Sequence, residues 1–230
     1  MAWTTPRTWT TGELVTAAMM NTHVRDNENY LYDALLPRYD SFTRADSATT
    51  LGNSEGPGTP AWSALNGTWG ISGNAAYIPT PAANVWNIAK LGAGSPNYRV
   101  RLGVVVATAS GPGIAFRIQD VNNFWSWHVD IVNSKISLMK MIAGTPTEVN
   151  SFAAATSNGD TYILEVEAHG NILLYRAQKV ASAANLFSAV SDESQLATAQ
   201  GVGLSGAEDV VFSGTENARY ATWNAEPLLF

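Results

Sequence analysis

The side chains best suited to acid–base chemistry are Glu165 and Glu167, which lie two positions apart in a run of strand-forming residues. Residues at this spacing on a β-strand point to the same face of the sheet, so the two carboxylates should lie side by side. Such a pair could be the acid and the nucleophile of a glycoside-hydrolysing enzyme. The spacing also fits an exposed sheet face, with Tyr162, Leu164 and Val166 on the buried face. Because a carboxylate pair alone is a weak sign of catalysis, we favour the exposed face, assign no catalytic residue and expect no enzymatic activity.

The segment 122–128 offers binding chemistry instead. It places Trp125 and Trp127 on one face of a predicted strand, shortly after Asn122 and Asn123. Sugar recognition requires an exposed aromatic ring beside hydrogen-bonding side chains. Tryptophan is also highly buried on average, so the alternative is that both rings belong to a core. These four residues are the carbohydrate-binding site that the sequence predicts.

The remaining polar residues do not define a metal or cofactor site. His23, His128 and His169 are far apart in the chain and do not have metal-ligand spacing. Asp120 and Asp130, with the asparagines near them, could offer oxygen ligands to calcium, but a turn explains them equally well. The chain has no cysteine and no phosphate-binding or dinucleotide-binding motif. We therefore expect neither a metal nor a cofactor.

Composition limits the class of protein further. The chain has 230 residues, of which 46% are hydrophobic and 14% charged, enough apolar material for a sizeable core. A net charge of −6 argues against general attraction to nucleic acid or to an anionic membrane. The sequence contains neither a signal peptide nor an apolar run long enough to span a bilayer, so we expect no membrane insertion.

Residues 40–230 have the pattern of an all-β domain. Strand-like runs recur at a spacing of roughly ten residues and are separated by Gly, Asn, Ser and Pro. The clearest runs are Asn84–Leu91, Tyr98–Ala107, Gly113–Asp120, Phe124–Val132, Lys135–Ile142, Thr147–Phe152, Thr161–Ala168, Asn171–Lys179, Gly201–Leu204 and Val210–Ser213. Many short strands at even spacing predict an antiparallel β-sandwich or barrel.

Residues 1–39, which we call the leader, are a separate segment with the only long helical periodicity of the chain. Thr10 and Thr16 can each serve as the N-cap, so the sequence predicts a helix that begins after one or the other. Pro37 ends the helix. An isolated helix of about twenty residues is only marginally stable in water, so it needs a partner.

The helical stripe identifies the residues through which the leader should make contact. The set expected to anchor or oligomerise the chain is Trp9, Leu14, Met19, Asn21, Val24, Arg25, Asn27, Leu31 and Leu35. Polar residues within the stripe argue against a long autonomous coiled coil, although they could fix the register among identical helices. The helix could pack on its own β-domain, or it could associate with further copies or with a larger particle. The apolar area beyond a single stripe favours the second interpretation.

Both parts of the chain resemble known families. The leader contains Thr8-Trp9, Gly12-Glu13, Val15-Thr16-Ala17, Asn21 and Arg25-Asp26-Asn27. In these residues it is similar to a segment common at the N-termini of tailed-bacteriophage structural proteins. The body contains Asp40–Arg44, Leu51-Gly52, Gly67–Ile71, Gly113–Arg117, Tyr162–Val166 and Gly201–Leu204. In these pieces it resembles concanavalin-like, or laminin-G-like, jelly-roll domains.

Together the resemblances imply a non-enzymatic structural protein of a phage virion, assembled in the host cytoplasm and released by lysis. The preferred role is a tail fibre or tail-tip component that attaches to a host surface glycan. It would bind other virion proteins and further copies of itself, as a trimer by analogy with fibre architecture. One alternative is a capsid decoration or head-fibre protein. A polysaccharide depolymerase is another, but glycosidases of this fold class usually carry a third acidic residue where this chain has Ala168-His169-Gly170.

Overall fold

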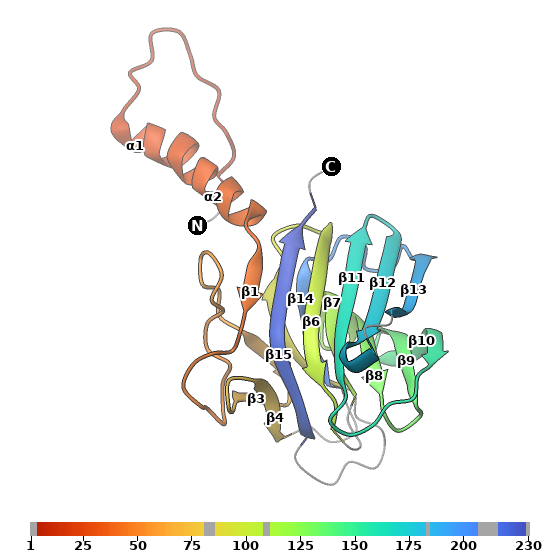
Figure 1. The fold of residues 1–230 in the computed structure, drawn as a ribbon. Helices are drawn as coiled ribbons and strands as arrows, with labels where there is room; N and C mark the ends of the chain where they lie inside the picture. Colours follow the sequence, from red (N-terminus) through yellow and green to blue (C-terminus); the bar gives the residue numbers. More distant parts are fainter. Residues whose placement is uncertain (1–3, 81–85, 108–110, 183–184, 207–215, 229–230) are drawn as a thin grey trace.

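A computed structural model describes residues 4–80, 86–107, 111–182, 185–206 and 216–228. A helical leader projects from a sandwich of two antiparallel β-sheets (Figure 1). The predicted all-β jelly-roll sandwich preceded by an N-terminal α-helix is therefore confirmed. None of the described helices is long and apolar enough to cross a membrane.

The sheet nearer the viewer in Figure 1 is called the front sheet, and the other is called the back sheet. In spatial order, the front sheet consists of β13 (Asn185–Asp192), β12 (Ile172–Lys179), β11 (Thr161–His169), β6 (Tyr98–Val105), β15 (Glu216–Pro227), β4 (Ala76–Thr80) and β3 (Thr68–Ile71), with β1 (Arg38–Asp40) also paired to β15. The back sheet consists of β10 (Thr145–Ala153), β9 (Lys135–Ile142), β8 (Asn123–Asp130), β7 (Pro112–Asp120), β14 (Gly201–Gly206), β5 (Asn87–Gly92) and β2 (Ser63–Asn66). The predicted strand Val210–Ser213 lies outside the described residues.

The core lies between the two sheets and follows from strand alternation. In β6 the side chains of Val100, Leu102 and Val104 are buried, whereas Arg99 and Arg101 point to the outer face. Strand β11 alternates in the same way, with Leu164 and Val166 among its buried residues. The front sheet thus has one apolar face and one polar face, as expected for an antiparallel sheet with one solvated side.

The central strands of the back sheet, β7, β8 and β14, are buried on both faces. On its outer face, Ile88, Ala115 and Phe124 form a second small apolar cluster, against which Trp86 packs. The Trp86 ring lies edge-on to Phe124, with ring centroids 5.9 Å apart, and to His128, with centroids 4.9 Å apart. Double burial explains why β7, β8 and β14 are nearly continuously apolar or small instead of strictly alternating.

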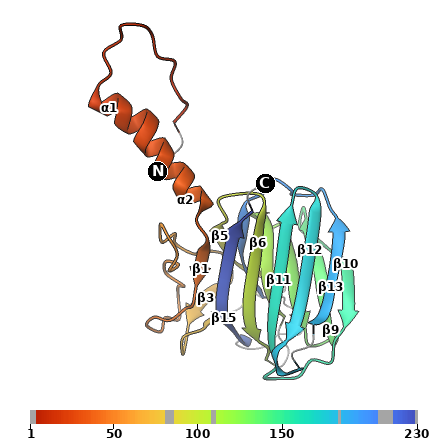
Figure 2. The same ribbon diagram turned by 45° about the horizontal axis from the view of Figure 1, so that its top comes forward.

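The leader contains one continuous helix made of α1 (Ala17–Met20), a π-helical turn (Asn21–Arg25) and α2 (Asp26–Leu35). It begins after Thr16, whose hydroxyl accepts a hydrogen bond from the Met19 N–H at 3.2 Å, so Thr16 is the N-cap of the two predicted candidates. The helix meets the sandwich at its C-terminal end, beside β15, and its remaining turns extend away from the body (Figure 2).

Asp40 joins the leader to the sandwich. Its buried carboxylate accepts hydrogen bonds from Trp62 Nε1 at 2.7 Å and from the Phe42 N–H at 2.8 Å. The Arg44 guanidinium binds both carboxylate oxygens, at 2.7 and 2.9 Å. Full pairing of this buried charge fixes the point at which the chain enters the sheet.

Candidate functional site

Trp125 and Trp127 do not form an exposed aromatic platform. Both rings are fully buried between the sheets. Trp125 Nε1 donates a hydrogen bond to the Gln195 carbonyl at 3.2 Å, and Trp127 Nε1 donates to the Arg176 carbonyl at 2.8 Å. The prediction that these residues stack on a sugar is therefore wrong. The physical reason is that these rings face the core and find hydrogen-bond partners inside it.

Asn122 lies in the turn between β7 and β8, and Asn123 is the first residue of β8. The Asp120 carboxylate accepts hydrogen bonds from the Asn122 N–H at 2.8 Å and from Asn123 Nδ2 at 3.0 Å. This is a turn held by its own side chains. The two asparagines lie close together, but the two tryptophans of the predicted carbohydrate-binding site point into the core. Their role in binding sugar stays a prediction.

The suggested calcium ligands are not brought together. Asp120 ends β7, whereas Asp130 ends β8 and accepts hydrogen bonds from Asn133. Within the described ranges, no three His, Asp or Glu side chains are grouped as a metal ion would require.

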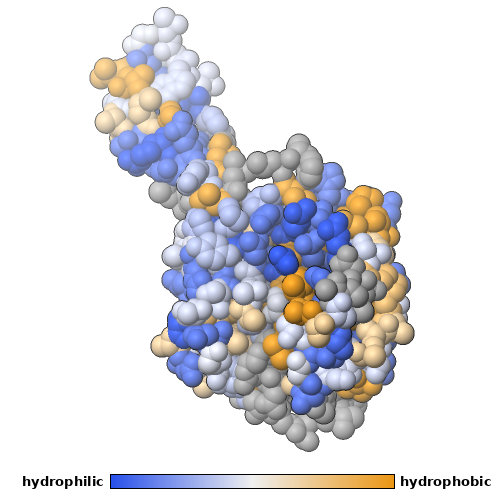
Figure 3. All heavy atoms as spheres, viewed as in Figure 1, coloured by the Kyte–Doolittle hydropathy of each residue, from blue (hydrophilic) through white to orange (hydrophobic). Residues whose placement is uncertain are grey.

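The outer face of the front sheet gathers charged residues from four strands. We call it the arginine–glutamate face, and it consists of Arg99 and Arg101 on β6, Glu165 and Glu167 on β11, Arg176 on β12 and Glu226 on β15. Side chains of β6, β11 and β12 meet there because the register sets Arg101 opposite Glu165, and Glu165 opposite Arg176. In Figure 3, hydrophilic side chains cluster over these strands around a small hydrophobic area.

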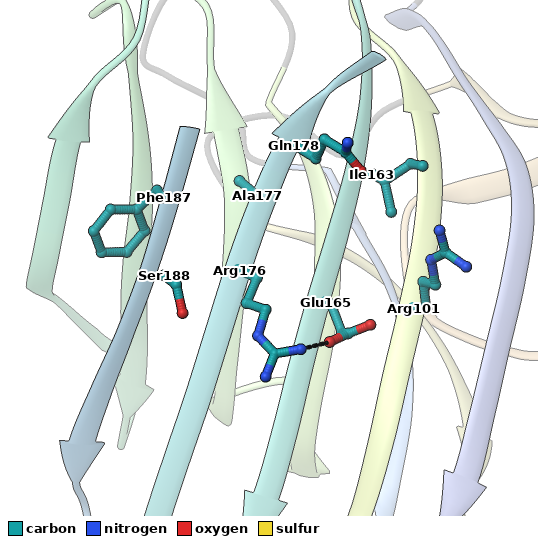
Figure 4. A pocket seen from close by; sticks show the side chains of 8 residues that line it. All are labelled: Arg101, Ile163, Glu165, Arg176, Ala177, Gln178, Phe187 and Ser188. Carbon is teal, nitrogen blue, oxygen red and sulfur yellow. Dashed lines mark hydrogen bonds and ion pairs between the residues drawn. The ribbon is translucent and has the colours of Figure 1, made fainter. Parts of the chain in front are cut away.

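The two glutamates lie side by side, as predicted, and both are engaged by arginines. Arg176 Nη1 lies 2.8 Å from Glu165 Oε1 (Figure 4), and Arg99 Nη2 lies 2.9 Å from Glu167 Oε1. Burial lowers the pKa of the Arg99 guanidinium, but the hydrogen bond to Glu167 and the charges of Glu165 and Glu226 outweigh it and raise the pKa above its usual range. These contacts form an ion-pair network across the sheet.

Two hollows open on this face, on either side of Arg101. One has a volume of about 300 Å³ and is lined by Arg101, Ile163, Glu165, Arg176, Ala177, Gln178, Phe187 and Ser188 (Figure 4). The other has a volume of about 370 Å³ and is lined by Arg99, Arg101, Gly103, Ile163, Glu165, Thr222, Trp223, Asn224 and Glu226. Guanidinium donors, carboxylate acceptors and amide groups around a hollow suit a ligand with many hydroxyl groups.

The leader exposes a second candidate surface. Of the predicted anchoring residues, Leu14 is 82% exposed, Leu31 is 49% exposed and Trp9 is 41% exposed. Asn21 and Arg25 are also exposed, and Val24 is half-buried. We call the set of Leu14, Asn21, Leu31 and the half-buried Val24 the leader seam. The side chain of Leu35 lies outside the described residues.

Two predicted anchoring residues act inside the leader instead. Asn27 is buried, and its side chain accepts a hydrogen bond from the Thr4 N–H at 2.9 Å and donates one to the Thr4 carbonyl at 2.8 Å. The sulfur of Met19 accepts a hydrogen bond from the Thr16 N–H at 3.4 Å. One side of the helix is therefore covered by the chain's own extended segment, while the seam remains open.

Comparison with solved structures identifies the body by its fold. A carbohydrate-binding module, CBM66 from Bacillus subtilis, matches with a TM-score of 0.53 at 14% identity, over 72% of this chain and 94% of that chain. The CBM2 module of the evolved Dit of Lactobacillus casei BL23 phage J-1 matches with a TM-score of 0.55 at 14% identity, over 84% of this chain and 96% of that one. The body thus has the jelly-roll sandwich fold of these modules.

Larger proteins contain the same fold as a part. The GH43 protein BlXynB from Bacillus licheniformis matches with a TM-score of 0.60 at 12% identity, over 83% of this chain but only 39% of that chain. No protein-family model and no curated protein sequence matches this chain. The similarities therefore define the architecture of the sandwich.

Proposed function

We propose that the chain is a non-enzymatic structural protein of a tailed-phage virion, a tail-fibre or tail-tip component whose sandwich binds glycan on the host surface. The observation that carries this proposal is the separation of two exposed surfaces. The leader seam, with Asn21, Val24 and Leu31 on the helix that projects from the body and Leu14 just before it, is one surface. The arginine–glutamate face on the front sheet is the other. A chain built in this way can be attached to a particle through its leader while the front sheet of its sandwich stays accessible to a ligand.

The exposed seam supports attachment through the leader. Full burial of a leucine side chain contributes roughly 1.5–3 kcal/mol, so Leu14 and Leu31 would each gain substantially from a partner. Burial of the seam among identical helices would give a homo-oligomer, with a trimer as the state suggested by fibre architecture. Other virion proteins would then hold the assembled leader on the particle. The similarity of the leader to N-terminal segments of phage structural proteins supports the same assignment.

The polar hollows support glycan binding by the body. Arg101, Glu165 and Asn224 provide donors and acceptors that can contact sugar hydroxyl groups from a sheet face. The fold is shared with a carbohydrate-binding module and with a module of a phage Dit protein. Several copies carried by one oligomer would convert weak individual sites into strong attachment.

The carboxylate pair supports a binding role without catalysis. Glu165 and Glu167 lie on one face, where they could flank a glycosidic bond, but arginine side chains engage both of them. In this arrangement the carboxylates act as fixed hydrogen-bond acceptors. We therefore assign them to the binding surface.

Immunolabelling of virions tests the location. Gold-labelled antibody raised against the body should mark the tail tip or the fibres of intact particles. Labelling confined to the head would contradict the tail role and would favour the decoration role instead.

Binding to host envelope polysaccharide tests the activity. The purified protein should bind immobilised polysaccharide, and Glu165→Gln should weaken binding about fivefold through loss of a charged acceptor. Glu148→Gln is the matched control, because Glu148 is also ion-paired, to Lys135, but lies on the back sheet. Polysaccharide shortened by the wild-type protein, but not by Glu165→Gln, would contradict the non-enzymatic assignment.

A further inference from the structure

We propose that the arginine–glutamate face recognises an acidic glycan, with Arg101 pairing to a carboxylate or phosphate group of the ligand. This inference rests on the proposed glycan binding and specifies the class of glycan. It follows from the pairing on the face, the hollow beside Arg101 and the balance of charge.

Arg101 is left without a partner by the pairing of its neighbours. In the strand register Arg101 lies opposite Glu165 on one side and opposite Asn224 on the other. Glu165, however, binds Arg176 at 2.8 Å, and Glu167 binds Arg99 at 2.9 Å. Among the residues that the structure describes, the Arg101 side chain makes no hydrogen bond and no ion pair, and it is exposed.

The space beside Arg101 is open because of Gly103. This glycine is two residues further along β6 and therefore belongs to the same face as Arg101. It has no side chain that would fill the space beside Arg101. Ile163 and Thr222 pair with Gly103 in the register and form two walls of the hollow. Its volume of about 370 Å³ lies within the range of small-ligand sites, roughly 300–1,000 Å³.

The chemistry of the guanidinium group defines the ligand. A planar guanidinium presents two parallel N–H groups that fit the two oxygens of a carboxylate or phosphate. Asn224 and Thr222, which line the same hollow, can hydrogen-bond to hydroxyl groups of the sugar that bears this anion. A neutral polysaccharide has no anionic group that could pair with Arg101.

The balance of charge restricts the ligand further. The face holds three guanidinium groups, on Arg99, Arg101 and Arg176, and three carboxylates, on Glu165, Glu167 and Glu226. Such a face has no net attraction for dense polyanions, which the carboxylates repel. It instead selects one anionic group delivered to Arg101 by a sugar chain that fits the hollow.

The test compares three forms of the host envelope polysaccharide: untreated, carboxyl-reduced and dephosphorylated. We expect wild-type protein to bind the untreated form and to lose about tenfold or more in affinity for one treated form, as expected for loss of a charged hydrogen-bonded pair. The sensitive form identifies the anion as carboxylate or phosphate. Arg101→Met should lower the affinity for the untreated form by the same factor. The affinity of this variant should be the same for all three forms. Arg101→Lys should have an affinity between those of wild type and Arg101→Met, because an ammonium group keeps the positive charge but lacks the two parallel N–H donors.

Lys90→Met serves as the control, since it removes one positive charge from the back sheet. Full binding by Arg101→Met, or equal binding of all three polysaccharide forms by wild type, would overturn acidic recognition and leave glycan binding standing. Absence of binding to any form would overturn both proposals. Urea unfolding of each variant checks that altered binding is not caused by altered folding.

Discussion

Arg117 is fully buried. It lies on β7, where the regular pairing of this strand with β8 is interrupted. Its backbone adopts a φ of 48°, and its side chain donates hydrogen bonds to the carbonyl groups of Glu193, Gln195 and Gly170. One side chain therefore holds two distant connections against the end of the sandwich. Arg117→Met should lower the free energy of unfolding by about 3 kcal/mol, since three buried carbonyls lose a charged donor.

Urea unfolding followed by tryptophan fluorescence measures this loss. Arg176→Met is the matched control, because the Arg176 side chain is about half exposed and its ion pair is worth less than about 1 kcal/mol. Equal effects of the two substitutions would show that the Arg117 contacts add little stability.

His128 should make stability depend on pH. Burial lowers the pKa of its imidazole to about 4, and its Nδ1 atom has no partner among the described residues. The unfolded chain, with a histidine pKa near 6.5, binds a proton that the folded chain resists. The stability from neutral His128 is therefore fully present above pH 6.5 and is lost, by up to about 3 kcal/mol, as pH falls towards 4.

Unfolding experiments between pH 7 and pH 4 test this dependence. His128→Gln should flatten the pH profile relative to wild type, whatever its effect at neutral pH. His169→Gln, at an exposed position at the end of β11, should leave the profile unchanged. A wild-type profile retained in His128→Gln would disprove the role of His128.

Residue-scale predictions from the sequence succeeded where they required only local geometry. The common face of Glu165 and Glu167 follows from the two-residue period of a strand, and the structure confirms it. The predicted exposure of Trp125 was wrong, because exposure depends on what packs against β8. The two-residue alternation of a strand does not reveal those neighbours. The free guanidinium of Arg101 was not predicted, because it depends on registers that join strands about 60 residues apart, as in the pairing of Arg101 with Glu165.

At the scale of elements, the leader combines a helix with a strap formed by its own extended residues. Asn27 bonds both to the N–H and to the carbonyl of Thr4, and the Trp9 ring lies edge-on to His23 with centroids 6.5 Å apart. Asn27→Ala should release residues 4–13 from the helix. The expected result is hydrogen exchange at least about tenfold faster within the leader, because local opening loses roughly two hydrogen bonds.

Hydrogen-exchange mass spectrometry resolves the leader from the body. Asn29→Ala provides the control, since Asn29 is exposed two positions further along the same helix. The exchange of β6 and β11 should not change in either variant, because in the described part of the chain the helix lies beside the sandwich at its C-terminal end. Equal exchange of the leader in the two variants would mean that the Thr4 contact does not hold the strap.

The elements themselves were predictable to different degrees. Alternating strands such as β6 and β11 and the Thr16-capped helix followed from periodicity and capping chemistry. Sequence also predicted strands β7 and β8, but their burial on both faces was not evident. It depends on Trp86, a residue outside both strands that packs on the outer face of the back sheet.

At the scale of the whole molecule, the seam and the arginine–glutamate face lie on two parts that meet at a small junction. The buried Asp40 carboxylate, bound by Arg44 and Trp62, secures the sandwich side of this junction. A partner on the leader would therefore leave the front sheet free. This division predicts that assembly and sandwich stability can be altered independently.

Substitution on the seam tests that independence. Leu31→Glu should abolish self-association of the full chain, because the oligomer would have to bury an unpaired carboxylate at a cost of several kcal/mol. Sedimentation velocity over a range of concentrations should show the wild type associating and the variant monomeric, with equal melting temperatures for the sandwich. Val190→Glu is the matched control, because Val190 is an exposed apolar residue on β13 of the body. A monomeric wild type would restrict the seam to other virion proteins, and assembly lost in Val190→Glu but kept in Leu31→Glu would place the interface on the sandwich.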